Sequence, residues 1–325
     1  MITESIQESN AALQLLTVSN LSVKRSIDDA QVLKNVSIDI SATQKVGIVG
    51  ESGSGKTTLV NAIIQQLAQG LSSSSGEIVF NDRKILPGDD AIINEMMGNE
   101  IGVISQNPFL SLNPLFSVGA QFRDILKRHL GLSKTAAKRE TIRILSELAI
   151  NEPNLVIKKY PHQLSGGMAQ RVMIGIATAC NPRLLIADEP TTGLDATIEN
   201  QVVSILNRVV NERQSGFLII SHNLQIIAQL TDYTYVMYAG SIVEQGPTDQ
   251  IISDPVHPYS KGLVSCMNSE KGSINFIPGR LPELGTESIG CAFRDRCKYA
   301  EEICFTTTPT LKKLSEDRYS ACFLS

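Results

Sequence analysis

No stretch of this 325-residue chain approaches the about 18 consecutive apolar residues that a membrane-spanning helix requires. Residues 1–12 also lack a basic start followed by an apolar core, so we expect no export signal. Long basic runs are missing too, and the formal net charge is −4, which argues against nucleic acid as the main partner. A role at a membrane would therefore require other chains that span the bilayer.

Internal repeats are absent as well, so the chain is expected to hold one copy of its main domain. An apolar content of 42% and a charged content of 19% are ordinary for a soluble globular protein. The length suits one full domain with a smaller appendage.

A glycine-rich segment, Gly50–Thr57, has the pattern G-x-x-x-x-G-K-[ST] and follows a strand-like run at residues 45–49. Its backbone N–H groups must converge on phosphate oxygens, and side chains at the glycine positions would block that approach. Lys56 can reach the β- and γ-phosphates, the Thr57 hydroxyl can bind Mg²⁺, and the helix that follows, to about residue 67, directs its positive end at the anion. The alternative is a structural glycine turn. The predicted nucleotide-binding residues are Gly50, Glu51, Ser52, Gly53, Ser54, Gly55, Lys56, Thr57 and Thr58.

Two carboxylates end a continuous apolar run at residues 184–187. Such a run is typical of a central parallel strand that is covered on both faces. Nucleotide sites in open α/β sheets lie at the carboxyl ends of strands. We therefore expect Asp188 beside the bound Mg²⁺ and Glu189 at the position of a general base for the attacking water. The alternative is a pair of solvated acids at a strand end.

A second candidate anion site is the segment Leu164–Met168, Leu-Ser-Gly-Gly-Met, which opens a helix-like run over residues 168–180. Ser165 is a good N-cap, and Gly166 and Gly167 leave backbone N–H groups bare at a helix start. A single ATP needs only one such cradle. Two different cradles in one chain indicate a nucleotide that is held between two subunits.

These motifs resemble those of the ATP-binding cassette (ABC) ATPases, a family of phosphate-loop NTPases. The resemblance implies an α/β fold over residues 13–247, with a RecA-like core, an antiparallel β subdomain and an α-helical subdomain at about 107–180. It also implies that Ser165, Gly166 and Gly167 serve the γ-phosphate that is bound by the partner's phosphate loop.

Three further residues match the family's motifs in the expected order. Gln106 matches the Q-loop glutamine, Asp195 the D-loop aspartate and His222 the switch histidine. The resemblance implies that Gln106 helps to organise Mg²⁺ and the attacking water, and that His222 steadies the γ-phosphate. Taken singly, Gln106 could be a solvated loop residue, His222 a structural histidine and Asp195 a helix cap.

Four stretches are closer to the importers of dipeptides, oligopeptides and nickel, namely residues 107–114, 160–168, 257–259 and 277–279. This resemblance implies a subunit that hydrolyses ATP and energises import through ATP-driven dimerisation. The implied partners are a second ABC ATPase, with a heterodimer favoured over a homodimer, two transmembrane permeases and, through them, an extracytoplasmic solute-binding protein. The chain would lie at the cytoplasmic face of a bacterial inner membrane as a peripheral protein.

Other functions stay open at this point. A soluble ABC protein of translation or DNA maintenance commonly has two cassettes or a long coiled-coil insertion, and neither is evident here. A nucleotide-gated assembly module without catalysis is disfavoured by Glu189 and His222. The cargo of an importer is not determined, since the ATPase never meets it, so peptides, a nickel chelate and sugars all remain.

Four of the six cysteines lie in the predicted C-terminal extension, residues 248–325, with the spacings C-x5-C, C-x6-C and C-x17-C. A cytosolic setting disfavours disulfides, so clustered thiols suggest a metal site, but neither short spacing fits structural zinc. Zinc and unligated or oxidised thiols are the alternatives to an iron–sulfur cluster. Cys180 and Cys266 are expected to be ordinary buried or half-buried cysteines. The resemblance implies a [4Fe–4S] cluster on Cys291, Cys297, Cys304 and Cys322.

The chain has no aromatic residue before Phe80, whereas the family usually stacks an aromatic ring on adenine near the end of the first strand. Arg25 occupies this region and could stack its guanidinium on the base. The alternative is an exposed basic residue.

The remaining expectations concern local structure. Paired strands are predicted at residues 13–23 and 32–40, and a hairpin at 233–243. A flexible loop is predicted at 71–76, before a strand at 77–80. Apolar spacing predicts helices within 116–150.

Overall fold

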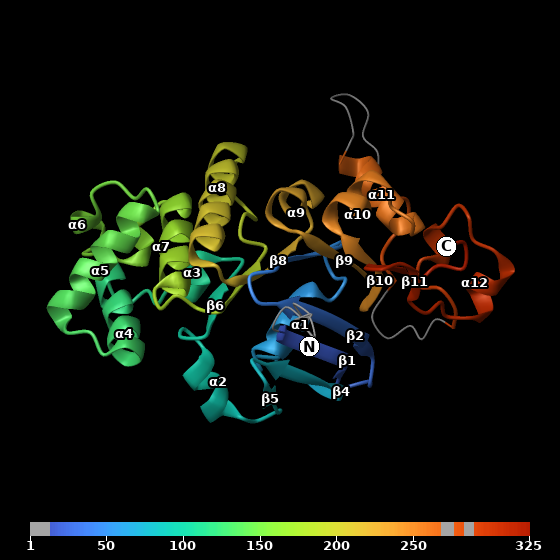
Figure 1. Ribbon diagram of the computed structural model, residues 1–325, viewed down its shortest axis with the longest axis horizontal. Coiled ribbons are helices and arrows are strands. Elements are labelled where there is room, and N and C mark those ends of the chain that lie inside the picture. Colours follow the sequence, from blue (N-terminus) through green and yellow to red (C-terminus); the bar gives the residue numbers. More distant parts are fainter. Residues whose placement is uncertain (1–13, 268–275, 283–288) are drawn as a thin grey trace, which may run out of the picture.

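Two β-sheets, one largely parallel and one antiparallel, form the centre of the computed structural model (Figure 1). The structure describes residues 14–267, 276–282 and 289–325. Within these ranges, no helix combines the length and the apolar character that crossing a bilayer requires. The arrangement is the predicted α/β architecture.

The larger sheet has eight strands in the order β11-β12-β10-β9-β3-β8-β7-β6. β10 (Ser241–Pro247) pairs antiparallel with β9 and completes the predicted hairpin. The parallel strands are covered on both faces and almost wholly buried, which explains their unbroken apolar runs. These strands are β3 (Lys45–Val49), β6 (Ile101–Ile104), β7 (Leu184–Asp188), β8 (Gly216–Ser221) and β9 (Tyr233–Tyr238).

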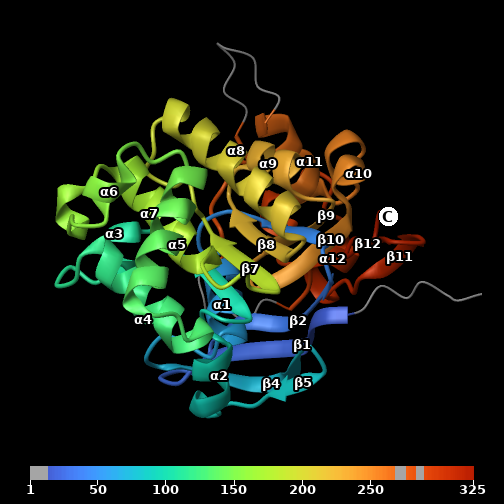
Figure 2. The ribbon, with the colours of Figure 1, turned by 60° about the vertical axis from the view of Figure 1, so that its left-hand side comes forward.

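Alternate residues of the parallel strands belong to two different hydrophobic cores. Along β8, Phe217 and Ile219 pack on one face, whereas Leu218 and Ile220 pack on the other. Figure 2 shows helices above the larger sheet and the antiparallel sheet, with α1 (Lys56–Ile63), below it. The helices above the sheet are α7 (Gly166–Thr178), α8 (Ala196–Arg213), α9 (Leu224–Leu230), α10 (Thr248–Ser253) and α11 (Pro258–Met267).

The smaller sheet is antiparallel, in the order β2-β1-β4-β5. The pairing of β1 with β2 confirms the two predicted strands, but the predicted loop at residues 71–76 is wrong, because these residues are the first half of β4. Their polar side chains do not prevent this, since β1 supplies ladder partners such as Val23 opposite Ser73, and one face of an antiparallel sheet can meet water. The strands are β1 (Gln14–Arg25), β2 (Gln31–Ser41), β4 (Leu71–Phe80) and β5 (Arg83–Ile85).

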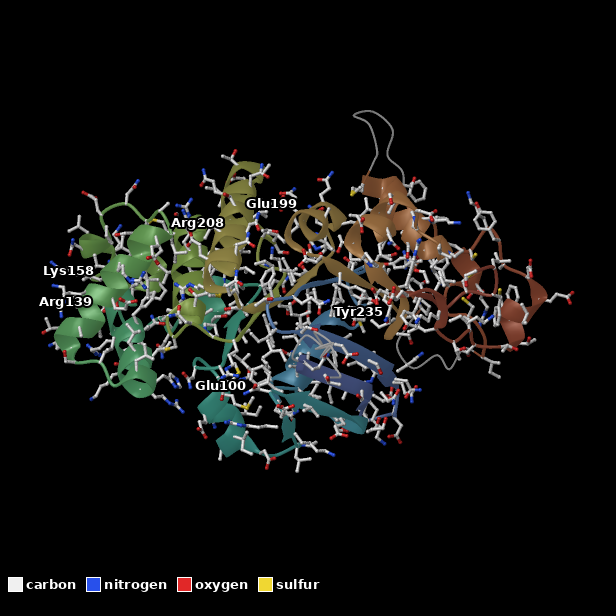
Figure 3. All side chains as sticks on the ribbon, viewed as in Figure 1. Glu100, Arg139, Lys158, Glu199, Arg208 and Tyr235 are labelled. Carbon is white, nitrogen blue, oxygen red and sulfur yellow. The ribbon has the colours of Figure 1, made fainter. Side chains whose placement is uncertain are left out.

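Tyr235 links the two sheets (Figure 3). It lies on β9, and its hydroxyl accepts a hydrogen bond of 3.0 Å from the backbone N–H of Asp39 on β2. Burial raises the pKa of Tyr235, so the hydroxyl stays neutral. The antiparallel sheet is thereby fixed against the strands beside the phosphate loop.

Helices between β6 and β7 form one end of the molecule, at the left of Figure 1. In α4 (Val118–Leu130), the buried residues Val118, Phe122 and Leu126 recur every four positions, which confirms the predicted helical pattern. Ser117 caps this helix by accepting a hydrogen bond from the Ala120 N–H. The neighbouring elements are α2 (Asp90–Met96), α3 (Pro108–Ser111), α5 (Lys134–Glu147), α6 (Pro153–Val156) and η1 (Pro161–Gln163).

The C-terminal extension continues the larger sheet. β12 (Arg318–Ser320) pairs with β10, and β11 (Lys312–Ser315) pairs with β12. Arg318 forms an ion pair of 3.2 Å with the fully buried Glu244 of β10. The Glu244 carboxylate also accepts hydrogen bonds from the backbone N–H groups of Val256 and His257, at 2.9 and 2.8 Å. The remaining elements of the extension are η2 (Arg294–Arg296) and α12 (Glu302–Thr306).

Candidate nucleotide-binding site

The phosphate loop lies between β3 and α1, as the sequence predicts, and its glycines are required by space and backbone conformation. A Cβ on Gly50 would lie 2.2 Å from the Met237 carbonyl oxygen. Gly53 and Gly55 have φ angles of 85° and 104°, which other residues rarely adopt. The loop therefore keeps a tight curve with its backbone amides uncovered by side chains at these positions.

Lys56 is buried and lies inside the curve of the loop. Its Nζ donates hydrogen bonds to the carbonyl oxygens of Gly50 (2.7 Å) and Glu51 (2.9 Å). Burial lowers the pKa of Lys56, while the nearby carboxylates of Glu189 and Asp188 act in the opposite direction. The ammonium is thus held where a phosphate group of a bound nucleotide could replace its carbonyl contacts.

Thr57 and Asp188 come together from α1 and the end of β7. The Thr57 hydroxyl donates a hydrogen bond of 3.2 Å to Asp188 Oδ1. Burial raises the pKa of Asp188, and the Glu189 charge adds to this, whereas Thr57 and Lys56 stabilise its charged form. A hydroxyl and a carboxylate side by side are the oxygen ligands that Mg²⁺ takes together with phosphate oxygens and water. The two residues thus fit the expected Mg²⁺ ligand set, in which the ion would supply charge neutralisation at the phosphates.

Glu189 is the meeting point of three polar side chains. Its Oε2 accepts a hydrogen bond from Thr192 Oγ1 at 2.8 Å and from Gln106 Nε2 at 3.4 Å. His222 Nδ1 lies 3.3 Å from the same oxygen. The structure therefore brings Gln106, Glu189 and His222 together from the ends of three different strands.

The backbone at Glu189 has a φ of +45°, a conformation that non-glycine residues rarely adopt. Its N–H donates a hydrogen bond of 2.9 Å to the carbonyl oxygen of Ile220 on β8. This bond fixes the turn that directs the carboxylate towards Gln106 and His222. Sequence reasoning missed Thr192, whose only signal was its place three residues after Glu189.

Ser165 caps α7, as predicted, because its hydroxyl accepts a hydrogen bond from the Met168 N–H at 3.4 Å. A Cβ on Gly167 would lie 2.9 Å from Ile198 at the start of α8, so this glycine permits close packing of the two helices. Asp195 caps α8 with bonds of 3.0 Å from the Thr197 and Ile198 amides. In the part of the chain that the structure covers, no hydrogen bond joins Ser165 or its two glycines to the phosphate loop.

Arg25 lies at the end of β1 and is partly exposed. Its Nε donates a hydrogen bond of 2.9 Å to Asp28, and this contact raises the pKa of the guanidinium. The side chain is therefore anchored in the loop after β1 and not in the core.

Four cysteines of the C-terminal extension (residues 248–325, called the tail below) come together, and none is in a disulfide. They line one cavity of about 10 Å³ beside Phe293 and Tyr299. Among the described residues, however, no group of three or more His, Cys, Asp or Glu side chains is placed to hold a metal ion, so the expected iron–sulfur cluster gains no support here. Burial raises the pKa of the Cys291 and Cys297 thiols. The four residues are Cys291, Cys297, Cys304 and Cys322.

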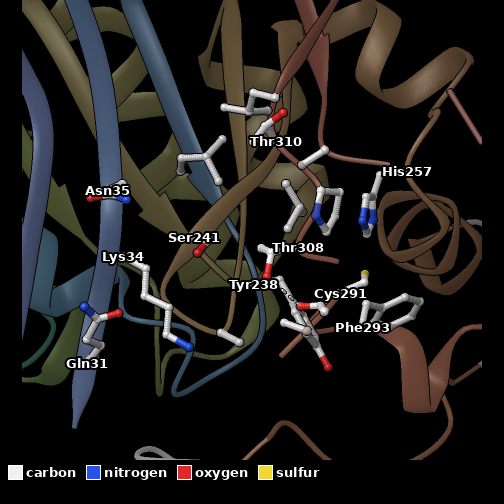
Figure 4. A pocket seen from close by; sticks show the side chains of 18 of the residues that line it. Gln31, Lys34, Asn35, Tyr238, Ser241, His257, Cys291, Phe293, Thr308 and Thr310 are labelled. Carbon is white, nitrogen blue, oxygen red and sulfur yellow. Dashed lines mark hydrogen bonds between the residues drawn. The ribbon is translucent and has the colours of Figure 1, made fainter. Parts of the chain in front are cut away.

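A larger cavity of about 520 Å³ separates β2 from the tail (Figure 4). Lys34 lines it on one side, and Tyr238, His257 and Cys291 line it on the other. None of the predicted nucleotide residues contributes to its wall. Tyr238 and His257 belong instead to the aromatic contact between the tail and the core.

The tail also reaches the phosphate loop, which the sequence did not predict. The backbone N–H of Glu51 donates a hydrogen bond of 2.8 Å to the hydroxyl of Tyr259 on α11. The Glu51 carboxylate forms an ion pair of 3.1 Å with Arg296. Tyr259 lies in a stretch that suggested a family resemblance, but nothing in its pattern indicated this contact.

Comparison with known proteins identifies the family. The protein-family model described as "ABC transporter" matches residues 33–192. A second family model, described as "Oligopeptide/dipeptide transporter, C-terminal region", matches residues 243–304. The oligopeptide transport ATP-binding protein OppD of Salmonella typhimurium is 39% identical over 326 residues, which cover 99% of this chain and 96% of that protein. The chain belongs to the ABC transporter ATPases. Within them it falls in the dipeptide and oligopeptide importer group, which confirms the predicted family, and its enzymatic activity is ATP hydrolysis.

Other relatives agree with this assignment. OppD of Bacillus subtilis is 37% identical over 318 aligned residues. The alignment covers 96% of this ABC ATPase and 89% of the Bacillus protein. The solved structure of cbiO1 from Clostridium perfringens, described as part of the ABC transporter complex cbiONQ, aligns with a TM-score of 0.62 at 25% identity over 74% of this chain and 91% of that one. The ABC cassette MJ0796, in a dimeric structure with ADP and Pi, aligns with a TM-score of 0.64 at 24% identity over 72% of this chain and 99% of that one, a likeness of fold. These neighbours confirm the predicted ABC cassette fold.

Proposed function

We propose that this ABC ATPase hydrolyses ATP to drive the import of peptides through a membrane transporter. The observation that carries the proposal is the Glu189 carboxylate, which is held by Thr192, Gln106 and His222 beside the phosphate loop. A non-catalytic nucleotide switch would not need a carboxylate fixed at this point. The relatives are named as oligopeptide transport and peptide import proteins, which favours peptides over a nickel chelate as the cargo.

In this mechanism the phosphate loop holds the triphosphate through its backbone amides and Lys56. Thr57 and Asp188 would provide oxygen ligands for Mg²⁺, which would neutralise phosphate charge when bound. Glu189 accepts a proton from the attacking water, and Gln106 orients that water. His222 donates a hydrogen bond to the γ-phosphate, whose charge develops in the transition state. Arg25 contacts the adenine base through its guanidinium, which Asp28 holds in place.

The second anion cradle serves a neighbouring subunit. Ser165, Gly166 and Gly167 open α7 with free backbone amides, and Asp195 lies at the adjacent start of α8. In one chain they make no hydrogen bond to the phosphate loop within the described ranges, as expected if they complete the ATP site of a second ABC ATPase. ATP then joins two cassettes, and hydrolysis separates them. A heterodimer is the proposed form.

The transporter would further contain two transmembrane permeases and a solute-binding protein on the far side of the membrane, with this ATPase bound peripherally at the cytoplasmic face. Exposed apolar side chains directly after Gln106 support a docking surface for the permeases, because such a cluster otherwise costs solubility. Phe109, Leu110, Leu115 and Phe116 are 44%, 84%, 79% and 48% exposed. Gln106, which contacts Glu189, directly precedes this segment in the chain, so a change of nucleotide state can be passed to the segment.

The test is Glu189→Gln in the assembled, reconstituted transporter. We expect turnover to fall at least about 100-fold, because a general base of this kind contributes roughly 10²–10⁴-fold, while ATP binding is kept. Peptide-loaded binding protein should stimulate the wild-type ATPase, and a nickel chelate should not. Wild-type hydrolysis by the variant would exclude Glu189 as the base. Co-purification with ribosomes or DNA, instead of permeases, would favour the soluble ABC alternative.

We also propose an iron–sulfur cluster in the tail. Its support is that four free thiols from separate segments line one cavity. In a cluster each thiolate binds a different iron, so the ligands need not converge on one point as they must around a single ion. The cavity has room for about one water, so a cluster would have to push the segments apart. The proposed ligands are Cys291, Cys297, Cys304 and Cys322.

Anaerobic purification with assays of iron and labile sulfide tests this cluster. Cys304→Ser should lower the iron content, while the matched variant Cys266→Ser, outside the cavity, should not. Wild-type protein without iron and without broad visible absorbance would remove the proposal.

A further inference from the structure

Arg296 is an almost fully buried arginine that joins the cysteine-bearing tail to the phosphate loop. Its side chain is only 5% exposed. Nη1 lies 3.1 Å from the Glu51 carboxylate and donates a hydrogen bond of 3.3 Å to the hydroxyl of Tyr238. Glu51 is the second residue of the phosphate loop. The charge of Arg296 is therefore in direct contact with a residue of the phosphate loop.

The other guanidinium nitrogens fix Arg296 to the tail. Nε donates to the carbonyl oxygen of Pro278 at 2.7 Å, and Nη2 donates to that of Ile277 at 3.2 Å. The guanidinium also lies 5.7 Å from the ring centres of Tyr238 and Phe293. All three nitrogens are thus engaged, so the side chain has one defined position from which to act on Glu51.

Glu51 is held at three points. Its carboxylate faces Arg296, its N–H donates to the Tyr259 hydroxyl at 2.8 Å, and its carbonyl oxygen accepts from Lys56 Nζ at 2.9 Å. Lys56 Nζ donates a hydrogen bond to the backbone carbonyl of Glu51. A shift of Glu51 would therefore change the position of the Lys56 ammonium, the cation that binds phosphate. The tail therefore reaches Lys56 through a single intermediate residue.

Charge gives the contact a second consequence. A carboxylate in the phosphate loop repels a triphosphate unless a cation neutralises it. Among the described residues, Arg296 is the cation that forms an ion pair with Glu51. We propose that Arg296 is a positioning residue for ATP binding, which neutralises Glu51 and holds the phosphate loop in its binding conformation. The proposal rests on ATP binding by this loop and does not depend on the iron–sulfur cluster.

A double-mutant cycle in the full-length transporter tests the proposal, with Mg²⁺ and a non-hydrolysable ATP analogue as the probe. Arg296→Gln should raise the Kd roughly tenfold, as expected for the loss of one charge-assisted contact. Glu51→Gln should lower the Kd, and Glu51→Gln combined with Arg296→Gln should bring it back towards the wild-type value. Arg296→Lys, which keeps the charge, should change the Kd less than Arg296→Gln. In steady state, Arg296→Gln should raise the KM for ATP more than it lowers kcat.

Arg294→Gln is the matched control. It lies on the same short helix, but its side chain contacts the Ile289 carbonyl and Asp295 instead of the phosphate loop. We expect its Kd to equal that of the wild type. A wild-type Kd for Arg296→Gln would overturn the proposal. So would a double variant that binds as weakly as Arg296→Gln, since Arg296 would then act only through packing of the tail. If Arg296→Gln does not fold, the Kd of Glu51→Gln still tests the proposal. An unchanged or raised Kd would contradict the argument that the Glu51 carboxylate repels the triphosphate.

Discussion

Thr192→Val tests whether the hydroxyl of Thr192 holds the Glu189 carboxylate for catalysis. Of the three contacts to Glu189 Oε2, the bond from Thr192 is the shortest, at 2.8 Å against 3.3 Å from His222 and 3.4 Å from Gln106. Valine has nearly the same shape but no hydroxyl, so the carboxylate would keep only the two longer contacts.

The magnitude follows from the charge and the exposure of the two partners. A hydrogen bond to a charged group contributes about 1.5–3 kcal/mol. Thr192 is exposed in the single chain, so water can replace part of this bond, and the lower end of the range applies. A loss of about 1.4 kcal/mol corresponds to a tenfold fall in kcat. Thr192 makes no hydrogen bond to the phosphate loop within the described residues, so the KM for ATP should change little.

The assay is steady-state ATP hydrolysis by the reconstituted transporter at saturating ATP. Thr192→Ser is the control, because it keeps a hydroxyl at the same position, and we expect it to retain most of the wild-type kcat. If Thr192→Val hydrolyses ATP at the wild-type rate, the hydroxyl has no part in catalysis. If Thr192→Ser falls as far as Thr192→Val, the lost property is the methyl group and its packing.

Three further predictions concern binding and stability. Lys56→Ala should weaken equilibrium nucleotide binding itself, and an unchanged Kd by calorimetry would contradict its role. Burial lowers the pKa of His257 to about 4, so the unfolded chain binds the proton first on acidification. Stability should therefore fall as the pH drops from about 6.5 towards 4, by about 2 kcal/mol between pH 7.5 and pH 5, and urea unfolding of His257→Asn should lack this component. Arg318→Met leaves the Glu244 carboxylate buried without its cation and should cost about 3–5 kcal/mol in urea unfolding, part of which Glu244→Gln should restore in the double variant.

Much of the cassette could be predicted because its signals are local. The unbroken apolar run of β8 and the four-residue spacing in α4 follow directly from burial on two faces of a sheet and on one face of a helix. The helix caps Ser165 and Asp195 act within three residues of themselves, so the sequence contains both partners of each bond. The exception is β4, where a serine-rich segment suggested a loop although β1 offers it a complete set of ladder partners.

Contacts between distant segments could not be predicted in the same way. Thr192 and Arg296 carry no motif of their own, and each is defined only by the group that it meets. The cysteines show a similar limit. Their clustering in the sequence suggested a metal site, and the fold does place the four around one cavity, but within the described residues it does not give them the geometry of a metal-ion site.

The sequence by itself determined the phosphate loop, the order of the motifs along the chain and the family, because backbone conformation and burial pattern impose particular residue types at fixed spacings. Only the tertiary structure decided that the tail contacts this loop through Arg296 and Tyr259. Arg296 and Glu51 are 245 positions apart in the sequence and 3.1 Å apart in space. Such a pair leaves no periodic pattern, since its energy depends on the approach of two surfaces and not on the spacing of residues along either one.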